Sequence, residues 1–163
     1  MSVQTIIQSL ERLVSVHEAL LAISQEKTEI VKVGSIDKLQ ALLVKERKQI
    51  RLLEQVEAKR QESAEAWAKS RAIAVEQATI TTMLETIEDA AEQEALADIT
   101  TKLTNLITKL KQQEQLNQAL LNQSMQFVQL SLDMLNPSIN NLNYGNKSKD
   151  KGDTSRSLFD SQA

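Results

Sequence analysis

The scarcity of turn-forming residues limits what this chain can fold into more than any other feature. The first 136 residues contain one glycine, Gly34, and no proline. Tight turns and most sheets depend on glycine and proline, so little of this chain can form them. Leu, Ala, Gln, Glu, Lys and Ile predominate, which is typical of long helices. We therefore predict an all-α protein, an elongated antiparallel helical hairpin or coiled-coil bundle with a long C-terminal helix and a disordered tail.

The N-terminal half has the apolar rhythm of two helices joined by a short reversal. Apolar spacings of three and four predict one helix over residues 3–33 and a second from residue 36 into the sixties. Gly34 stands where a helix C-cap needs left-handed backbone. Ser35 is the predicted N-cap of the next helix, with Asp37 in its first turn. Trp67 is either a packing anchor or an exposed interaction residue.

The pattern weakens over residues 70–90, which are predicted to form a connector with one short helix. Thr82 and Glu85 have the spacing of a capping box, so this helix should begin at Thr82 and reach about Ala90. A last helix is predicted over residues 91–135, and Asn136-Pro137 ends it. Residues 1–137 are therefore predicted to form one helical domain. Residues 138–163 are polar and are predicted to be a disordered tail.

The end of the last helix carries two apolar stripes. On a wheel at about 100° per residue, the first stripe is predicted to run without a break along the whole helix: Leu96, Ile99, Leu103, Leu106, Ile107, Leu110, Leu121, Met125, Val128, Leu132 and Leu135. The second stripe lies about 140° away on the same wheel and is confined to the C-terminal end: Leu116, Leu120, Phe127, Leu130 and Met134. A polar seam of Asn117, Ser124 and Ser131 is predicted between the two stripes.

One stripe is enough to pack a helix onto its own bundle, so the second stripe predicts another partner. A binding site for a client protein is predicted at Leu116, Leu120, Leu121, Met125, Phe127, Leu130 and Met134. Self-association would bury the second stripe equally well, and the residues alone leave both readings open. The methionines and glutamines form an adaptable surface, which favours a chaperone-like groove over a fixed dimer seam.

Other function classes are disfavoured by composition. The net charge of −3 and the pI near 5.3 argue against nucleic-acid binding. Glu11 and Arg12 interrupt any secretory core, and glutamine, asparagine and serine in the uncharged C-terminal stretch argue against membrane insertion. There is no cysteine, His17 is the only histidine, and no glycine-rich phosphate loop occurs. We expect a cytoplasmic protein that is not an enzyme and has no cofactor or metal.

Several short sequences resemble the FlgN-like family of flagellar export chaperones. They are Gly34-Ser35 followed by Leu39-Gln40-Ala41-Leu42-Leu43, then Asn117-Gln118-Ala119-Leu120-Leu121, and finally Asn143-Tyr144-Gly145. The resemblance extends over about residues 3–145.

The resemblance implies a small cytosolic helical protein that binds the hook–filament junction proteins FlgK and FlgL. Members of the family grip the C-terminal helical segments of these clients, prevent premature polymerisation and hand them to the type III export gate. The end of the last helix would be the client site, and Tyr144 would contact the gate. Independently of the resemblance, the free protein is expected to be a monomer or a weak homodimer. The alternatives are a structural coiled coil that self-associates through its C-terminal helix and a helical substrate secreted by a type III system.

Overall fold

A computed structural model describes residues 3–135, and all of their regular structure is helical. The elements are α1 (Val3–Val33), α2 (Ile36–Ser70), the 3-10 helix η1 (Val75–Gln77), α3 (Ile80–Thr86) and α4 (Ala90–Leu135). The predicted all-α class is confirmed. The chain divides into two compact units, Met1–Leu121 and Asn122–Ala163, and the described part of the second unit is residues 122–135 of α4. The predicted domain boundary at 137 lies outside the described residues.

The reversal between α1 and α2 is at the predicted residues. Gly34 has a φ of 76°, and its N–H donates to the carbonyls of Ile30 and Val31 at 3.0 and 3.2 Å. The N–H of Ser35 donates to the Ile30 carbonyl at 3.4 Å. These bonds form a Schellman motif, which satisfies carbonyls at the end of α1. Ser35 is the N-cap residue of α2, but its side chain makes no capping hydrogen bond.

The connector contains the predicted short helix, but that helix begins one turn earlier than expected. The hydroxyl of Thr79 accepts the backbone N–H of Thr82 at 3.2 Å, which makes Thr79 the N-cap of α3. Thr82 is therefore the third residue of the helix, and the prediction that α3 starts there is wrong. The helix ends at Thr86 instead of near Ala90, because the chain leaves helical geometry at Ile87.

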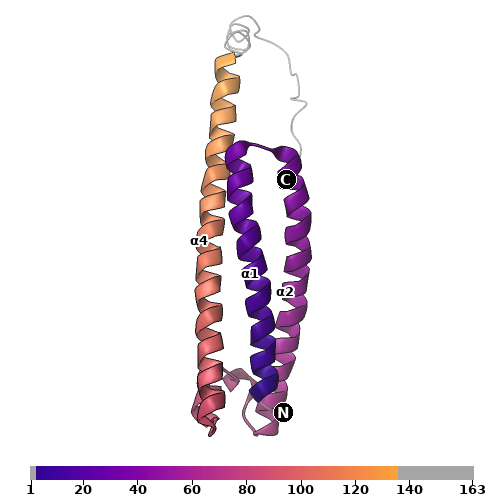
Figure 1. The fold of residues 1–163 in the computed structure, drawn as a ribbon, viewed down its shortest axis with the longest axis vertical. Helices are drawn as coiled ribbons and strands as arrows, with labels where there is room; N and C mark the ends of the chain where they lie inside the picture. The colour runs from indigo at the N-terminus through magenta and orange to yellow at the C-terminus, as the bar shows by residue number, and fades with distance from the viewer. Residues whose placement is uncertain (1–2, 136–163) are drawn as a thin grey trace, which may run out of the picture. The chain divides into compact units, whose positions relative to one another are not determined.

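Within the first unit, α1 lies between α2 and α4 (Figure 1). The apolar face of α1 contributes more of the buried core than any other described helix, and Trp67, Met83 and Leu96 from the other helices pack into the same core. Trp67 is fully buried, so it is a packing anchor and not an exposed interaction residue. The guanidinium of Arg71 lies 5.5 Å from the centre of the Trp67 ring, within cation–π range.

Candidate functional site

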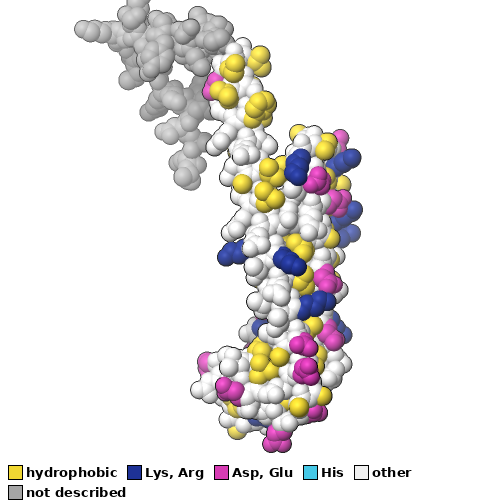
Figure 2. Space-filling view, turned by 60° about the vertical axis from the view of Figure 1, so that its left-hand side comes forward, with side chains coloured by type: hydrophobic (Ala, Val, Ile, Leu, Met, Phe, Trp, Pro, Cys, Tyr) yellow, Lys and Arg dark blue, Asp and Glu magenta, His cyan; other side chains and the backbone are white. Residues whose placement is uncertain are grey.

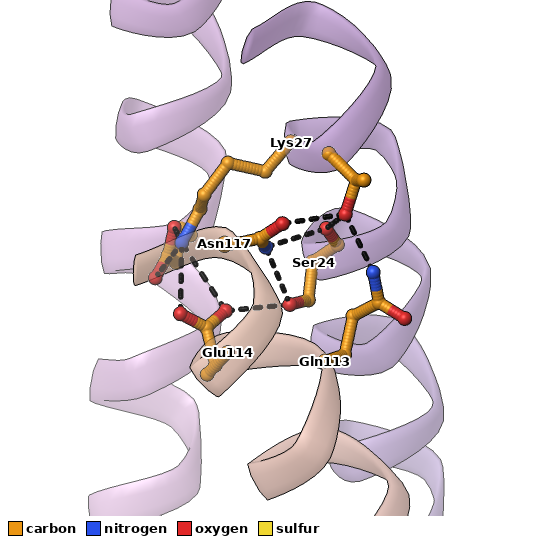
Figure 3. Close-up of polar contacts among 7 residues, drawn as sticks. Ser24, Lys27, Gln113, Glu114 and Asn117 are labelled. Carbon is orange, nitrogen blue, oxygen red and sulfur yellow. Dashed lines mark hydrogen bonds and ion pairs between the residues drawn. The ribbon is translucent and has the colours of Figure 1, made fainter. Parts of the chain in front are cut away.

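Seven polar side chains connect α1, α2 and α4 within the first unit, and we call them the polar layer (Figure 3). Three come from α1, one from α2 and three from α4: Ser24, Lys27, Thr28, Glu46, Gln113, Glu114 and Asn117. Apolar contacts permit neighbouring helices to slide, whereas paired polar groups specify one register. The polar layer therefore fixes where α4 meets the hairpin of α1 and α2.

Lys27 is the charged centre of the polar layer. Its side chain is 8% exposed, and Nζ lies 2.7 Å from Oε2 of Glu46 and 3.2 Å from Oε1 of Glu114. Burial acts to lower the pKa of Lys27, but hydrogen bonds and charge from Glu46 and Glu114 together outweigh it and raise the pKa above its ordinary value. Lys27 consequently remains an ammonium ion that joins three helices.

Asn117 provides the uncharged half of the polar layer. Its Nδ2 donates to the backbone carbonyl of Ser24 at 2.9 Å and to Oγ of Ser24 at 3.1 Å, and its Oδ1 accepts from the hydroxyl of Thr28. Gln113 donates to that same hydroxyl. Asn117 is fully buried. It therefore packs against α1 as part of the bundle, which differs from the predicted seam between two apolar stripes.

The polar layer also corrects the predicted first stripe of α4. Glu114 and Asn117 occupy the face towards α1 between Leu110 and Leu121, so the stripe is interrupted there and the expectation of an unbroken stripe is wrong. The sequence of α1 contains a signal for this polar layer, which a helical wheel of α4 alone does not show. On α1, residues 24, 27 and 28 are polar where the spacing of three and four calls for apolar side chains.

None of the seven predicted client-binding residues is buried. In the first unit, Leu116 is exposed, and Leu120 and Leu121 are half-buried. In the second unit, the exposed fractions are 70% for Met125, 70% for Phe127, 58% for Leu130 and 72% for Met134. Apolar side chains as exposed as these are typical of surfaces that bind a partner. Tyr144, the predicted export-gate residue, lies outside the described residues.

The first stripe is exposed in the second unit as well. Val128, Leu132 and Leu135 are each at least half exposed. Both stripes are therefore exposed along residues 122–135 of α4. The wheel of one helix gives the directions of its stripes but not how far along the helix a neighbour covers them.

The surface of this helix end is almost free of charge. No charged residue occurs from Gln115 to Leu132. Asp133 follows, and its carboxylate accepts a hydrogen bond from Gln129 at 3.2 Å. Figure 2 shows mostly hydrophobic and uncharged side chains on this part of α4, with an acidic side chain near its end, whereas side chains of Lys, Arg, Asp and Glu are scattered over the first unit. A partner of this surface would therefore be held by apolar contacts and not by ion pairs.

His17 lies beside a pocket of about 450 Å³ in the first unit, which is lined by apolar side chains of α1, α2, α3 and α4. Its Nδ1 donates to the Leu13 carbonyl at 2.7 Å. Arg60 donates to Glu57, one turn away on α2, at 2.6 Å beside the same pocket, and this hydrogen bond lowers the pKa of Glu57. Among residues 3–135, no group of three or more histidine or acidic side chains could hold a metal ion. The ionisable groups of the pocket are paired within the protein.

No helix within residues 3–135 is both long enough and apolar enough to cross a membrane. The fold and the surface together define an all-α helical bundle whose last helix ends in exposed, uncharged apolar side chains. A family model described as FlgN protein matches residues 1–152, and the chain belongs to this family of flagellar export chaperones. The chain is also similar to the uncharacterized protein YvyG of Bacillus subtilis (strain 168), with 34% identity over 165 residues that cover all of both chains. No solved structure matches the chain.

Proposed function

We propose that this protein binds the hook–filament junction proteins FlgK and FlgL in the cytoplasm, prevents their premature polymerisation and delivers them to the flagellar type III export apparatus. Membership of the FlgN family supports the general role of flagellar export chaperone. The choice of clients rests on the resemblance described above. One structural observation supports the binding role, namely the large apolar side chains that α4 exposes in an uncharged stretch.

The proposed mode of binding is the docking of an amphipathic client helix along α4. The apolar face of such a helix would cover Phe127, Leu130 and Met134, through client residues spaced at i, i+3, i+4 and i+7. Burial of each large side chain contributes about 1.5–3 kcal/mol before the cost of ordering the client. That ordering costs roughly 2–5 kcal/mol, which leaves binding reversible and suited to later release. Catalysis and ATP have no part in this proposal.

Three further side chains of the predicted site belong to the first unit. We propose that Leu116, Leu120 and Leu121 also contribute to client binding. Leu116 is the most accessible of them, and Leu120 and Leu121 are each half-buried. Because partly buried side chains have less area left to lose on binding, each of these two should contribute less than Phe127.

The test is the double substitution Phe127→Ala with Leu130→Ala, measured by calorimetric titration with purified FlgK and FlgL. We expect affinity to fall by at least about thirtyfold, since two truncated contact residues cost 2 kcal/mol or more. Helix content and melting temperature should stay close to those of the wild-type protein, because both side chains are exposed. Gln126→Ala with Gln129→Ala is the matched control, because both residues lie in the same part of α4 but outside the two apolar stripes. Unchanged client affinity in the first variant would refute the proposed site.

Self-association is the second candidate function, because a copy of the same chain could also cover these exposed side chains. The mass of the purified protein in solution distinguishes the two candidates. A monomer that gains mass only when client is added supports the chaperone. A stable dimer that ignores the client and dissociates on Leu120→Asp supports the structural coiled coil.

Tyr144 is proposed to contact the export gate after the client has bound. If it does, Tyr144→Ala should leave client affinity unchanged and reduce the amount of FlgK and FlgL exported by cells. A loss of client affinity in this variant would instead place Tyr144 in the client site.

A further inference from the structure

Two separate apolar stripes remain uncovered on residues 122–135 of α4. Phe127, Leu130 and Met134 form one stripe, and Val128 and Leu132 belong to the other, which also includes Met125 and Leu135. The two stripes point about 140° apart around a helix with 3.6 residues per turn. A single docked helix covers an arc of about 100°, so it would cover one stripe and leave the other in water.

We propose that one client chain binds this helix end with two amphipathic helical segments, one on each stripe. This inference rests on the proposed chaperone function and adds the number of client segments and their chemistry. The two segments would lie on different sides of α4.

A second copy of this chain fits the two stripes less well than a two-segment client. A twofold dimer uses the same patch on both chains, so it would bury one stripe per chain and leave the other exposed. Closed rings of three or four parallel helices need contact faces about 60° or 90° apart, which is narrower than the angle between these stripes. A chain with two helical segments can reach both sides without this constraint.

The absence of charge defines the chemistry of the client segments. From Gln115 to Leu132 this chain has no charged side chain with which a client charge could pair. A client charge buried against these stripes would lose its hydration without gaining a counterion. Ser131, which lies between the stripes, already donates its hydroxyl to the Phe127 carbonyl at 2.9 Å. The docking faces of the client should therefore carry apolar residues flanked by Ser, Thr, Asn or Gln.

The experiment compares two double variants of the full-length protein that each disable one stripe. Val128→Ser with Leu132→Ser alters the first stripe, and Phe127→Ser with Leu130→Ser alters the second. Gln126→Ser with Gln129→Ser is the control, because it introduces the same number of serines into the same part of α4, with a similar cost in helix propensity. Helix content by circular dichroism verifies that all three variants keep the helix.

Affinity is measured by calorimetric titration with intact FlgK and with its C-terminal helical segment alone. Either stripe variant should weaken binding of intact FlgK by at least about tenfold, because each removes central contacts. The isolated segment should respond to only one of the two stripe variants. The control variant should bind both probes like the wild-type protein.

Different failures have different meanings. If intact FlgK is insensitive to one stripe variant, the two-segment inference is wrong and the proposed chaperone function stands. Two FlgK molecules bound per chaperone would also overturn the claim that one chain supplies both segments. A wild-type dimer that either stripe variant dissociates would assign the stripes to a second copy. If the wild-type protein binds neither FlgK nor FlgL, the proposed function and this inference both fail.

Discussion

Substitution of Lys27 by methionine tests whether the polar layer holds the three helices of the first unit together. Methionine is unbranched and apolar, so Lys27→Met keeps much of the packing of the lysine stem and removes the ammonium group. The ammonium contacts Glu46 at 2.7 Å and Glu114 at 3.2 Å. Without it, two carboxylates remain beside each other with no cation between them. The variant should therefore destabilise the fold.

The exposure of the two carboxylates sets the size of the expected effect. Removal of one partner from a fully buried ion pair typically costs about 3–5 kcal/mol. The side chain of Glu46 is 19% exposed and that of Glu114 is 43% exposed, so water screens part of the repulsion that remains. We expect the free energy of unfolding to fall by about 2–3 kcal/mol, below the range for a fully buried pair.

Equilibrium unfolding in urea, followed by tryptophan fluorescence, measures this loss. Trp67 is the only tryptophan and is fully buried in the same unit, so its emission reports whether the core is intact. Lys32→Met is the matched control, since Lys32 pairs with Glu29 on the surface at 3.1 Å. An exposed pair of this kind contributes less than about 1 kcal/mol.

The comparison between the two lysine variants decides the outcome. If Lys27→Met lowers the free energy of unfolding no more than Lys32→Met does, the buried contacts of Lys27 with the two carboxylates do not stabilise the fold. The role given to the polar layer in fixing α4 would then be wrong. A changed dependence of the unfolding free energy on urea concentration would point instead to a change in the surface exposed on unfolding.

Three further predictions concern the stability of the first unit. The pKa of Lys27 in the folded protein is raised above its ordinary value of 10.5. The stabilisation of the fold by the Lys27 ammonium is therefore fully present below pH 10.5 and is lost as pH rises through the folded pKa. In urea unfolding measured at a series of alkaline pH values, the difference in unfolding free energy between wild type and Lys27→Met should be constant near neutral pH and shrink above pH 10.5. Gly34→Ala should lower the free energy of unfolding by about 1 kcal/mol in urea, because the backbone φ at this position is 76°. The cost comes from the backbone and not from a clash, since an added Cβ would meet nothing within 4 Å. Trp67→Ala should lower the free energy of unfolding, followed by circular dichroism, by about 3–5 kcal/mol. Trp67→Phe should lower it clearly less, because the indole N–H that phenylalanine lacks is buried without an acceptor.

The sequence predicts the hairpin of α1 and α2 closely because its signals are local. Gly34 is the only glycine in the first 136 residues, and the left-handed backbone at the reversal strongly favours that residue type. On either side of Gly34, the apolar spacing of three and four residues indicates a helix and no other element. The observed ends at the reversal, Val33 and Ile36, follow from these two features.

The start of α3 shows how local signals can compete. Thr79 and Thr82 are both capable of capping, and only Thr82 is followed by a glutamate at the position that a capping box requires. In the structure Thr79 caps the helix, and the Thr82 side chain instead lies 3.0 Å from the Thr79 hydroxyl. Motif spacing alone does not decide between two caps one turn apart.

The polar layer could not be assembled from the sequence in the same way. It joins residues about 90 positions apart, such as Ser24 and Asn117, and depends on the register between α1 and α4. A helical wheel gives the direction of a side chain but does not identify what faces it. The exposed second stripe was predictable for the opposite reason, because it has no upstream continuation on its own helix.

The helical state of residues 122–135 has a consequence for the energetics of client binding. A separate segment of this length would be marginally helical in water, because the first turn of a helix is costly to form. In this protein the segment belongs to α4, a helix of 46 residues, and Asn117 in that same helix is tied to α1 by side-chain hydrogen bonds. The costly first turn is therefore formed before any client arrives, and the remaining turns need only propagate from it. The exposed stripes are thus pre-organised, so the entropic cost of binding falls mainly on the client.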